Sequence, residues 1–107
     1  MRYHYDPDAD ALYIELRYGE IDHQHEQSDG VLLDLAADGS LIGVDVMVPG
    51  SGWAAEEIIS DRHLSRNEGD LLIALARIQT WQPRGSKQGA AVHSVSHGSL
   101  AGILVKS

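Results

Sequence analysis

Three carboxylates are the side chains in this sequence best placed to do chemistry. Glu15, Asp34 and Asp45 each lie where apolar and polar residues alternate, so in a strand each points away from the apolar face. Tyr13 and Arg17 share the polar face with Glu15. Carboxylates held close together bind a metal ion, act as an acid–base pair, or need a cation to relieve their repulsion. We take these five residues as the candidate functional face.

A simpler interpretation of these residues is an acidic surface on which Arg17 forms an ion pair, and the sequence favours it. Gly50-Ser51-Gly52 lacks the lysine of a phosphate-binding loop, and no serine has the surroundings of a nucleophile elbow. We therefore assign no catalytic or cofactor-binding residue and expect no cofactor. Whether a metal binds stays open.

The run Asp6, Asp8 and Asp10 is similar to the start of a calcium-binding loop. The pattern then fails, because Ala11 stands where such a loop needs glycine and Arg17 where it needs glutamate. Aspartates around Pro7 are better explained as a turn.

Two histidine pairs have spacings that metal sites use. His23 and His25 would share one face of a strand, and His93 and His97 stand four residues apart. The surroundings of His93 are strand-like, and no glutamate follows it as in a helical zinc motif. We interpret both pairs as surface histidines.

The element that would position Asp34 and Asp45 is a hairpin around Asp38-Gly39, which supplies the positive φ angles of a tight turn. A two-residue turn there predicts three facing apolar pairs. They are Leu35 with Ile42, Leu33 with Val44, and Val31 with Val46. Asp34 then faces Gly43, one diagonal step from Asp45. Leu41 falls on the polar side.

Five segments have strand character: 3–5, 11–17, 20–27, 31–36 and 41–48. Their apolar face needs a cover, which two predicted helices supply. The first is Trp53–Ser60, capped by Ser51 or Gly52. The second begins at a Ser65–Glu68 capping box, buries Leu71, Leu75 and Ile78, and ends at Pro83.

The predicted fold class is therefore α+β, a small antiparallel β-sheet of three to four strands, in meanders or hairpins, covered by one long and one short helix. We expect one domain over residues 1–84. Residues 85–107 are predicted to be a flexible linker and tail or an added strand.

Charge is unevenly distributed along the chain. Residues 1–70 hold all 16 acidic residues against four basic ones, a net charge of −12, whereas residues 71–107 hold four basic residues and no acid. An acidic body repels phosphate, so we expect no nucleic-acid binding through it. No apolar run is long enough for a membrane span, cysteine is absent, and the N-terminus does not resemble a signal peptide. We expect a cytoplasmic protein.

Two blocks of sequence carry a family resemblance. They are Tyr5-Asp6, Ala9–Ile14 and Leu16, followed by Asp29–Val31, Asp34, Asp38-Gly39, Gly43-Val44 and Val46. Over residues 3–48 the chain resembles domain of unknown function family 2283, small bacterial and phage proteins. It departs in having Ala36-Ala37 where acidic residues are usual and Asp45 where glutamate is usual.

The resemblance implies a small antiparallel sheet followed by a helix, which would bring Glu15 beside Asp34 and Asp45. It implies no chemical activity. Some relatives lie beside small toxin-like proteins, which suggests an antitoxin.

Three functional hypotheses follow. The first is a non-catalytic protein-interaction module, antitoxin-like, whose acidic face meets a basic, toxin-like partner. The second is a small metal-dependent enzyme or metal-binding protein that uses Glu15, Asp34 and Asp45. The third is a homo-oligomeric structural module with an exposed self-association face. That face would hold Tyr13, Leu32, Leu41 and Met47.

Overall fold

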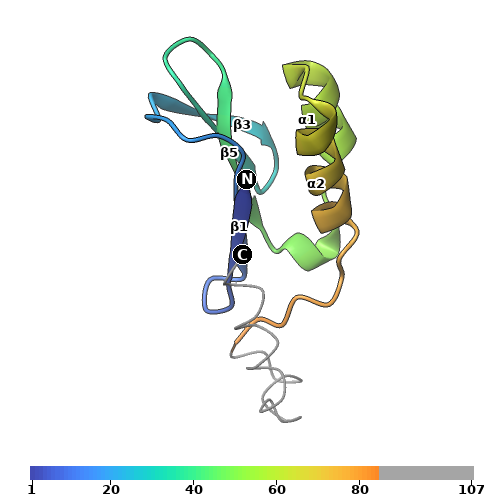
Figure 1. The fold of residues 1–107 in the computed structure, drawn as a ribbon. Coiled ribbons are helices and arrows are strands. Elements are labelled where there is room, and N and C mark those ends of the chain that lie inside the picture. The colour runs from blue at the N-terminus through green and yellow to red at the C-terminus, as the bar shows by residue number, and fades with distance from the viewer. Residues whose placement is uncertain (85–107) are drawn as a thin grey trace.

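The computed structural model describes residues 1–84, which form one sheet and two α-helices (Figure 1). The strands are β1 (Arg2–Asp6), β2 (Ala11–Glu15), β3 (His23–Ser28), β4 (Val31–Leu35) and β5 (Leu41–Met47). A 3₁₀ turn, η1 (Pro49–Ser51), leads to α1 (Ala55–Arg62) and α2 (Arg66–Ala76). The predicted α+β class is confirmed. The predicted tail or added strand at 85–107 lies outside the described residues.

The sheet is fully antiparallel, with strand order β1-β2-β5-β4-β3. It has five strands, more than the three to four predicted, because both β1 and β3 pair along their whole length as edge strands. Every neighbouring pair except β2–β5 is a hairpin, and β5 returns between β2 and β4.

The register of the β4–β5 hairpin is as predicted from Val31 to Asp34. Val31 pairs with Val46, Leu33 with Val44, and Asp34 with Gly43. Beyond that point the prediction is wrong.

A bulge shifts the pairing there, so that Leu35 pairs with Leu41 instead of Ile42. The loop contains three residues, since Ala36 N–H donates to the Ser40 carbonyl at 2.9 Å and Gly39 adopts φ +89°. The extra residue is Ile42, and Leu41 therefore points into the core.

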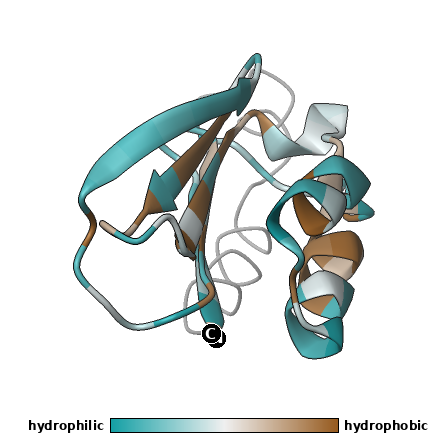
Figure 2. Ribbon diagram, turned by 90° about the horizontal axis from the view of Figure 1, so that it is seen from above, coloured by the Kyte–Doolittle hydropathy of each residue, from teal (hydrophilic) through white to brown (hydrophobic). Residues whose placement is uncertain are grey.

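Both helices cover one face of the sheet, and the core lies between the two layers (Figures 1 and 2). The buried cluster contains Tyr5, Leu12, Ile14, Leu33 and Val44 from the sheet. The helices add Ala55, Ile58, Leu72 and Leu75. In α2, Leu72 is fully buried. Leu71, which the sequence predicted to be buried, is only partly buried.

The helix boundaries differ from the sequence prediction. Helix α1 begins two residues later than expected, and its N-cap, Ala54, makes no side-chain hydrogen bond. Helix α2 begins at the predicted Ser65–Glu68 capping box but ends at Ala76 instead of near Pro83. Beyond the helix, Trp81 packs on the Tyr5 ring, with ring centroids 4.8 Å apart, a contact that requires the chain to return to the sheet.

Candidate functional site

The face of the sheet opposite the helices is polar, and we call it the outer face. Because side chains alternate along each strand, it holds the strand residues that do not point into the core. Its members discussed below are Tyr13, Glu15, Gln24, Glu26, Leu32, Asp34, Gly43, Asp45 and Met47. No element among residues 1–84 covers this face (Figure 2).

A hydrogen-bonded strip crosses the outer face from β2 to β3. The Tyr13 hydroxyl donates to Asp34 Oδ2 at 2.9 Å, and Gln24 Nε2 donates to Asp34 Oδ1 at 2.7 Å. Both carboxylate oxygens are therefore bound, and Asp34 is only 5% exposed. Burial and the bond to Asp34 raise the pKa of Tyr13, which keeps its hydroxyl protonated and able to donate.

Gly43 makes this strip possible. It lies on β5 between Tyr13 on β2 and Asp34 on β4. A methyl group at this position would overlap the Tyr13 hydroxyl and lie 2.6 Å from Tyr13 Cζ. A glycine inside a strand often marks such a close approach.

Asp45 is a partly buried carboxylate on this face that has neither a cation nor a side-chain hydrogen-bond donor among the described residues. It faces Tyr13 on one side and Leu32 on the other, and the described residues offer it no ion pair. Burial, and then the charge of Asp34, raise the pKa of Asp45. Its negative charge is therefore costly in the free protein.

The arginine that pairs with the outer face is not the one that the sequence predicted. Glu15 pairs with Arg2, whose Nε lies 2.7 Å from Oε1. Arg17 leaves the candidate face entirely, and its Nε and Nη2 reach Glu68 on α2 at 2.9 and 3.3 Å. The structure thus brings together Tyr13, Asp34 and Asp45, adds Glu15 at the edge of the group, and excludes Arg17.

The Asp6–Asp10 run forms a turn, as the sequence favoured. Asp6 Oδ1 accepts from the backbone N–H of Asp8 at 3.0 Å, and Asp10 Oδ1 accepts from the Tyr5 hydroxyl at 2.7 Å. Asp8 pairs with Arg84 at 3.0 Å. These partners explain the aspartates without a metal ion.

The histidines of β3 are exposed, and His23 Nδ1 lies 2.8 Å from Asp22. His93 and His97 lie outside the described residues. Across residues 1–84, no three or more His, Asp or Glu side chains are grouped so that they could hold a metal ion. The alternative with Glu15, Asp34 and Asp45 as metal ligands therefore gains no support from the geometry.

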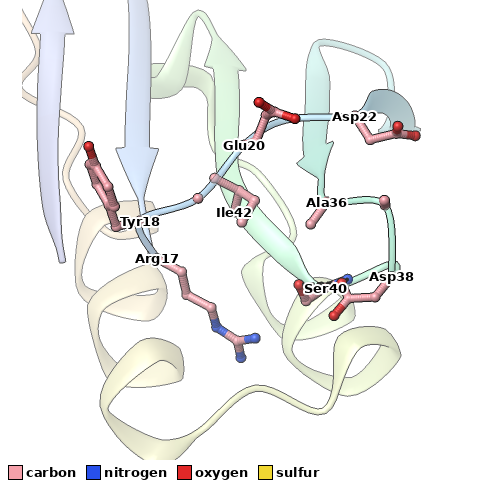
Figure 3. Close-up of a pocket in the computed structure, with 10 residues that line it drawn as sticks. Arg17, Tyr18, Glu20, Asp22, Ala36, Asp38, Ser40 and Ile42 are labelled. Atoms are coloured by element: carbon pink, nitrogen blue, oxygen red, sulfur yellow. Dashed lines mark hydrogen bonds between the residues drawn. The ribbon is translucent and has the colours of Figure 1, made fainter.

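An open groove of about 450 Å³ lies between the β2–β3 connection and the β4–β5 turn (Figure 3). Three carboxylates line it, Glu20, Asp22 and Asp38, together with Arg17 and the fully exposed Tyr18. The main-chain N–H and hydroxyl of Ser40 lower the pKa of Asp38. The groove adds to the negative surface, but its polar groups do not converge on a common point (Figure 3).

Sequence reasoning missed four residues that shape the site: Arg2, Gln24, Gly43 and Glu68. Gly43 carried a readable signal, since an isolated glycine within a strand pattern indicates close backbone approach. Gln24, Arg2 and Glu68 gave no such signal, because their partners are set by which strands and helices become neighbours.

These features define an α+β protein in which, over residues 1–84, the helices cover one face of the sheet. Residues 2–47, which span all five strands, match the family model described as "Protein of unknown function (DUF2283)". This match confirms the resemblance predicted for residues 3–48. No curated protein and no solved structure matches the chain.

The family match ends before α1, so both helices belong to the part of the chain outside it. Neither helix in residues 1–84 has the length and apolar character that crossing a bilayer requires.

Proposed function

We propose that this protein is a non-catalytic interaction module that binds a basic protein partner through its outer face. The observation that carries the proposal is Asp45, a partly buried carboxylate without a cation. It lies beside buried Asp34 on the sheet face that no element of residues 1–84 covers. An arginine or lysine from a partner would supply the missing charge.

The charge balance of the whole domain supports this proposal. Residues 1–84 contain 16 acidic residues and six arginines, a net charge of −10. Four of the six arginines are already in ion pairs, with Glu15, Glu68, Asp70 and Asp8. The domain therefore cannot neutralise its outer face from within, and a basic partner is the natural complement. A toxin-like protein is the partner class that the family resemblance suggests.

The homo-oligomeric alternative has less support. Of its four expected contact residues, Leu41 is buried in the core and Tyr13 is committed to Asp34. Leu32 and Met47 remain, and they are too few for an apolar self-association surface.

The proposal is tested by comparing two variants with the same charge change. The outer-face variant carries Glu26→Gln and Asp45→Asn, and the matched control carries Glu56→Gln and Glu57→Gln, which neutralise two exposed carboxylates of α1. Each immobilised protein is incubated with extract of the source cells at low salt, and retained proteins are identified by mass spectrometry. The affinity of the purified pair is then measured by calorimetry.

We expect wild type and the helix control to retain a basic protein. The outer-face variant should bind it at least tenfold more weakly, because a buried interface charge pair is worth about 2 kcal/mol or more. Wild-type binding should also weaken with added salt. Equal loss in both variants would show that net charge alone attracts the partner, and the outer face would then have no specific role.

A further inference from the structure

An aromatic side chain in a fixed position lies next to Asp45 on the outer face. Tyr13 on β2 is paired directly with Asp45 on β5. Its hydroxyl crosses β5 to reach Asp34 on β4, and its Cζ lies so close to Gly43 that an added methyl group there would be 2.6 Å away. The phenol therefore lies along the sheet instead of projecting from it. Tyr13 is still partly exposed, so its ring is accessible to a ligand.

The carboxylate of Asp45 has both oxygens free. Among residues 1–84 it takes part in no ion pair and accepts no hydrogen bond, whereas both oxygens of Asp34 accept side-chain hydrogen bonds. Glu15, the third carboxylate near Tyr13, has one oxygen bound by Arg2. Asp45 can therefore accept two hydrogen bonds at once from a planar donor.

Apolar side chains complete the surroundings of Asp45. Leu32 is paired with it across β4 and β5, and Met47 lies two residues farther along β5 on the same face, with 45% of its surface exposed. A lysine ammonium is strongly hydrated, so it loses much of its water shell next to a partly buried carboxylate. A guanidinium is more weakly hydrated, stacks on aromatic rings and donates to both oxygens of a carboxylate. These surroundings fit a guanidinium better than an ammonium group.

From this geometry we infer that the outer face recognises an arginine side chain in preference to a lysine. The guanidinium donates to both oxygens of Asp45 and stacks on the Tyr13 ring. The methylene groups of the arginine lie along Leu32 and Met47. The inference rests on the proposed function, to which it adds the residue that a basic partner presents to this face.

The full-length protein provides its own reporter for this test, because it contains only two methionines. Met47 lies on the outer face near Asp45, and Met1 precedes β1 and serves as the internal reference. The two methyl signals are followed by NMR after selective methionine labelling. Three probes are added in separate titrations: acetyl-arginine-methylamide, acetyl-lysine-methylamide and the uncharged acetyl-citrulline-methylamide. The variants are Asp45→Asn and, as the matched control, Glu57→Gln, which removes one exposed carboxylate of α1.

We expect the arginine probe to shift the Met47 signal to saturation and to leave the Met1 signal in place. The lysine probe should bind about two- to fivefold more weakly, the factor that cation–π stacking contributes at an exposed ring. The citrulline probe should cause no shift. Asp45→Asn should abolish the response to arginine, and Glu57→Gln should preserve it.

Equal affinity for the arginine and lysine probes would overturn the inference and leave the proposed function standing, because the face would still bind cations. A Met47 shift that survives Asp45→Asn, or no shift with the arginine probe, would also overturn it. Failure of the proposed function would show in the separate partner-capture comparison, which uses none of these probes.

Discussion

At the scale of single residues, Gly43 determines whether the outer-face strip can form. We predict that Gly43→Ala destabilises the protein by about 1–3 kcal/mol, because the methyl group displaces Tyr13 and leaves buried Asp34 short of a donor. The free energy of unfolding in urea measures the effect. In a Tyr13→Ala background the same substitution should cost much less. An equal cost in both backgrounds would show that strand propensity, and not the Tyr13 contact, explains the glycine.

The residue scale also marks the limit of the sequence prediction for the site. Alternation placed Asp34 and Asp45 correctly on one face, because a pleated strand leaves each side chain only two directions. It could not show that Tyr13 crosses a whole strand to reach Asp34, since that depends on β5 lying between β2 and β4. Arg17 was misassigned for a related reason. It lies two residues beyond the end of β2, where the alternation no longer applies, and α2 supplies its partner.

At the scale of elements, one cluster fixes α2 to the sheet. Glu68 accepts from the Ser65 N–H in the capping box at 3.0 Å and also from Arg17, beyond β2. The bond with Arg17 is the main reason that the pKa of Glu68 falls to about 2 from its usual 4.5. Because the folded-state pKa is depressed, the pair stabilises the fold above pH 4.5 and loses this contribution as pH falls toward 2.

Glu68→Gln tests this connection, since glutamine keeps the capping-box geometry but not the charge. We predict a loss of about 2 kcal/mol at pH 7, discounted from the full pKa shift because Arg17 is 43% exposed. The difference from wild type should shrink below pH 4.5 and vanish near pH 2. Denaturant unfolding between pH 7 and pH 3 measures it, with Glu57→Gln as an exposed-carboxylate control. A difference independent of pH would assign the loss to packing instead of charge.

The elements themselves were largely predictable, and the exceptions have physical causes. The Ser65–Glu68 cap and the pairing of Val31 with Val46 follow from local sequence. The Asp38-Gly39 pair permits both a two-residue turn and a three-residue loop with a bulge, and packing decides between them. The bulge buries Leu41 in the core, whereas Ile42 lies outside the core cluster and lines the groove near Gly19. Likewise, the chain leaves α2 before Pro83, and Trp81 then packs on the Tyr5 ring, a tertiary contact that the local sequence does not reveal.

At the scale of the whole molecule, residues 1–84 carry a net charge of −10, and repulsion among these charges opposes folding. The effect of each carboxylate on stability depends on where it lies. On the outer face, Asp45 lies beside Asp34 without a cation, so its charge opposes folding. In the first turn of α1, Glu56 and Glu57 lie at the positive end of the helix dipole, so their charges favour folding. Removing two negative charges from the outer face should therefore raise the stability of the fold, and removing two from α1 should lower it.

We predict that Glu26→Gln with Asp45→Asn raises the thermal midpoint at low salt by about 4–8 °C, corresponding to roughly 1 kcal/mol for a domain of this size. Glu56→Gln with Glu57→Gln should lower it slightly. Both differences should diminish in 1 M NaCl, where charges interact over only about 3 Å. Calorimetric scans of wild type and the two variants measure the thermal midpoints. If both variants rise equally, net charge alone governs stability. If the outer-face pair alone rises and also binds the partner more weakly, the charge that costs stability is the one used in recognition.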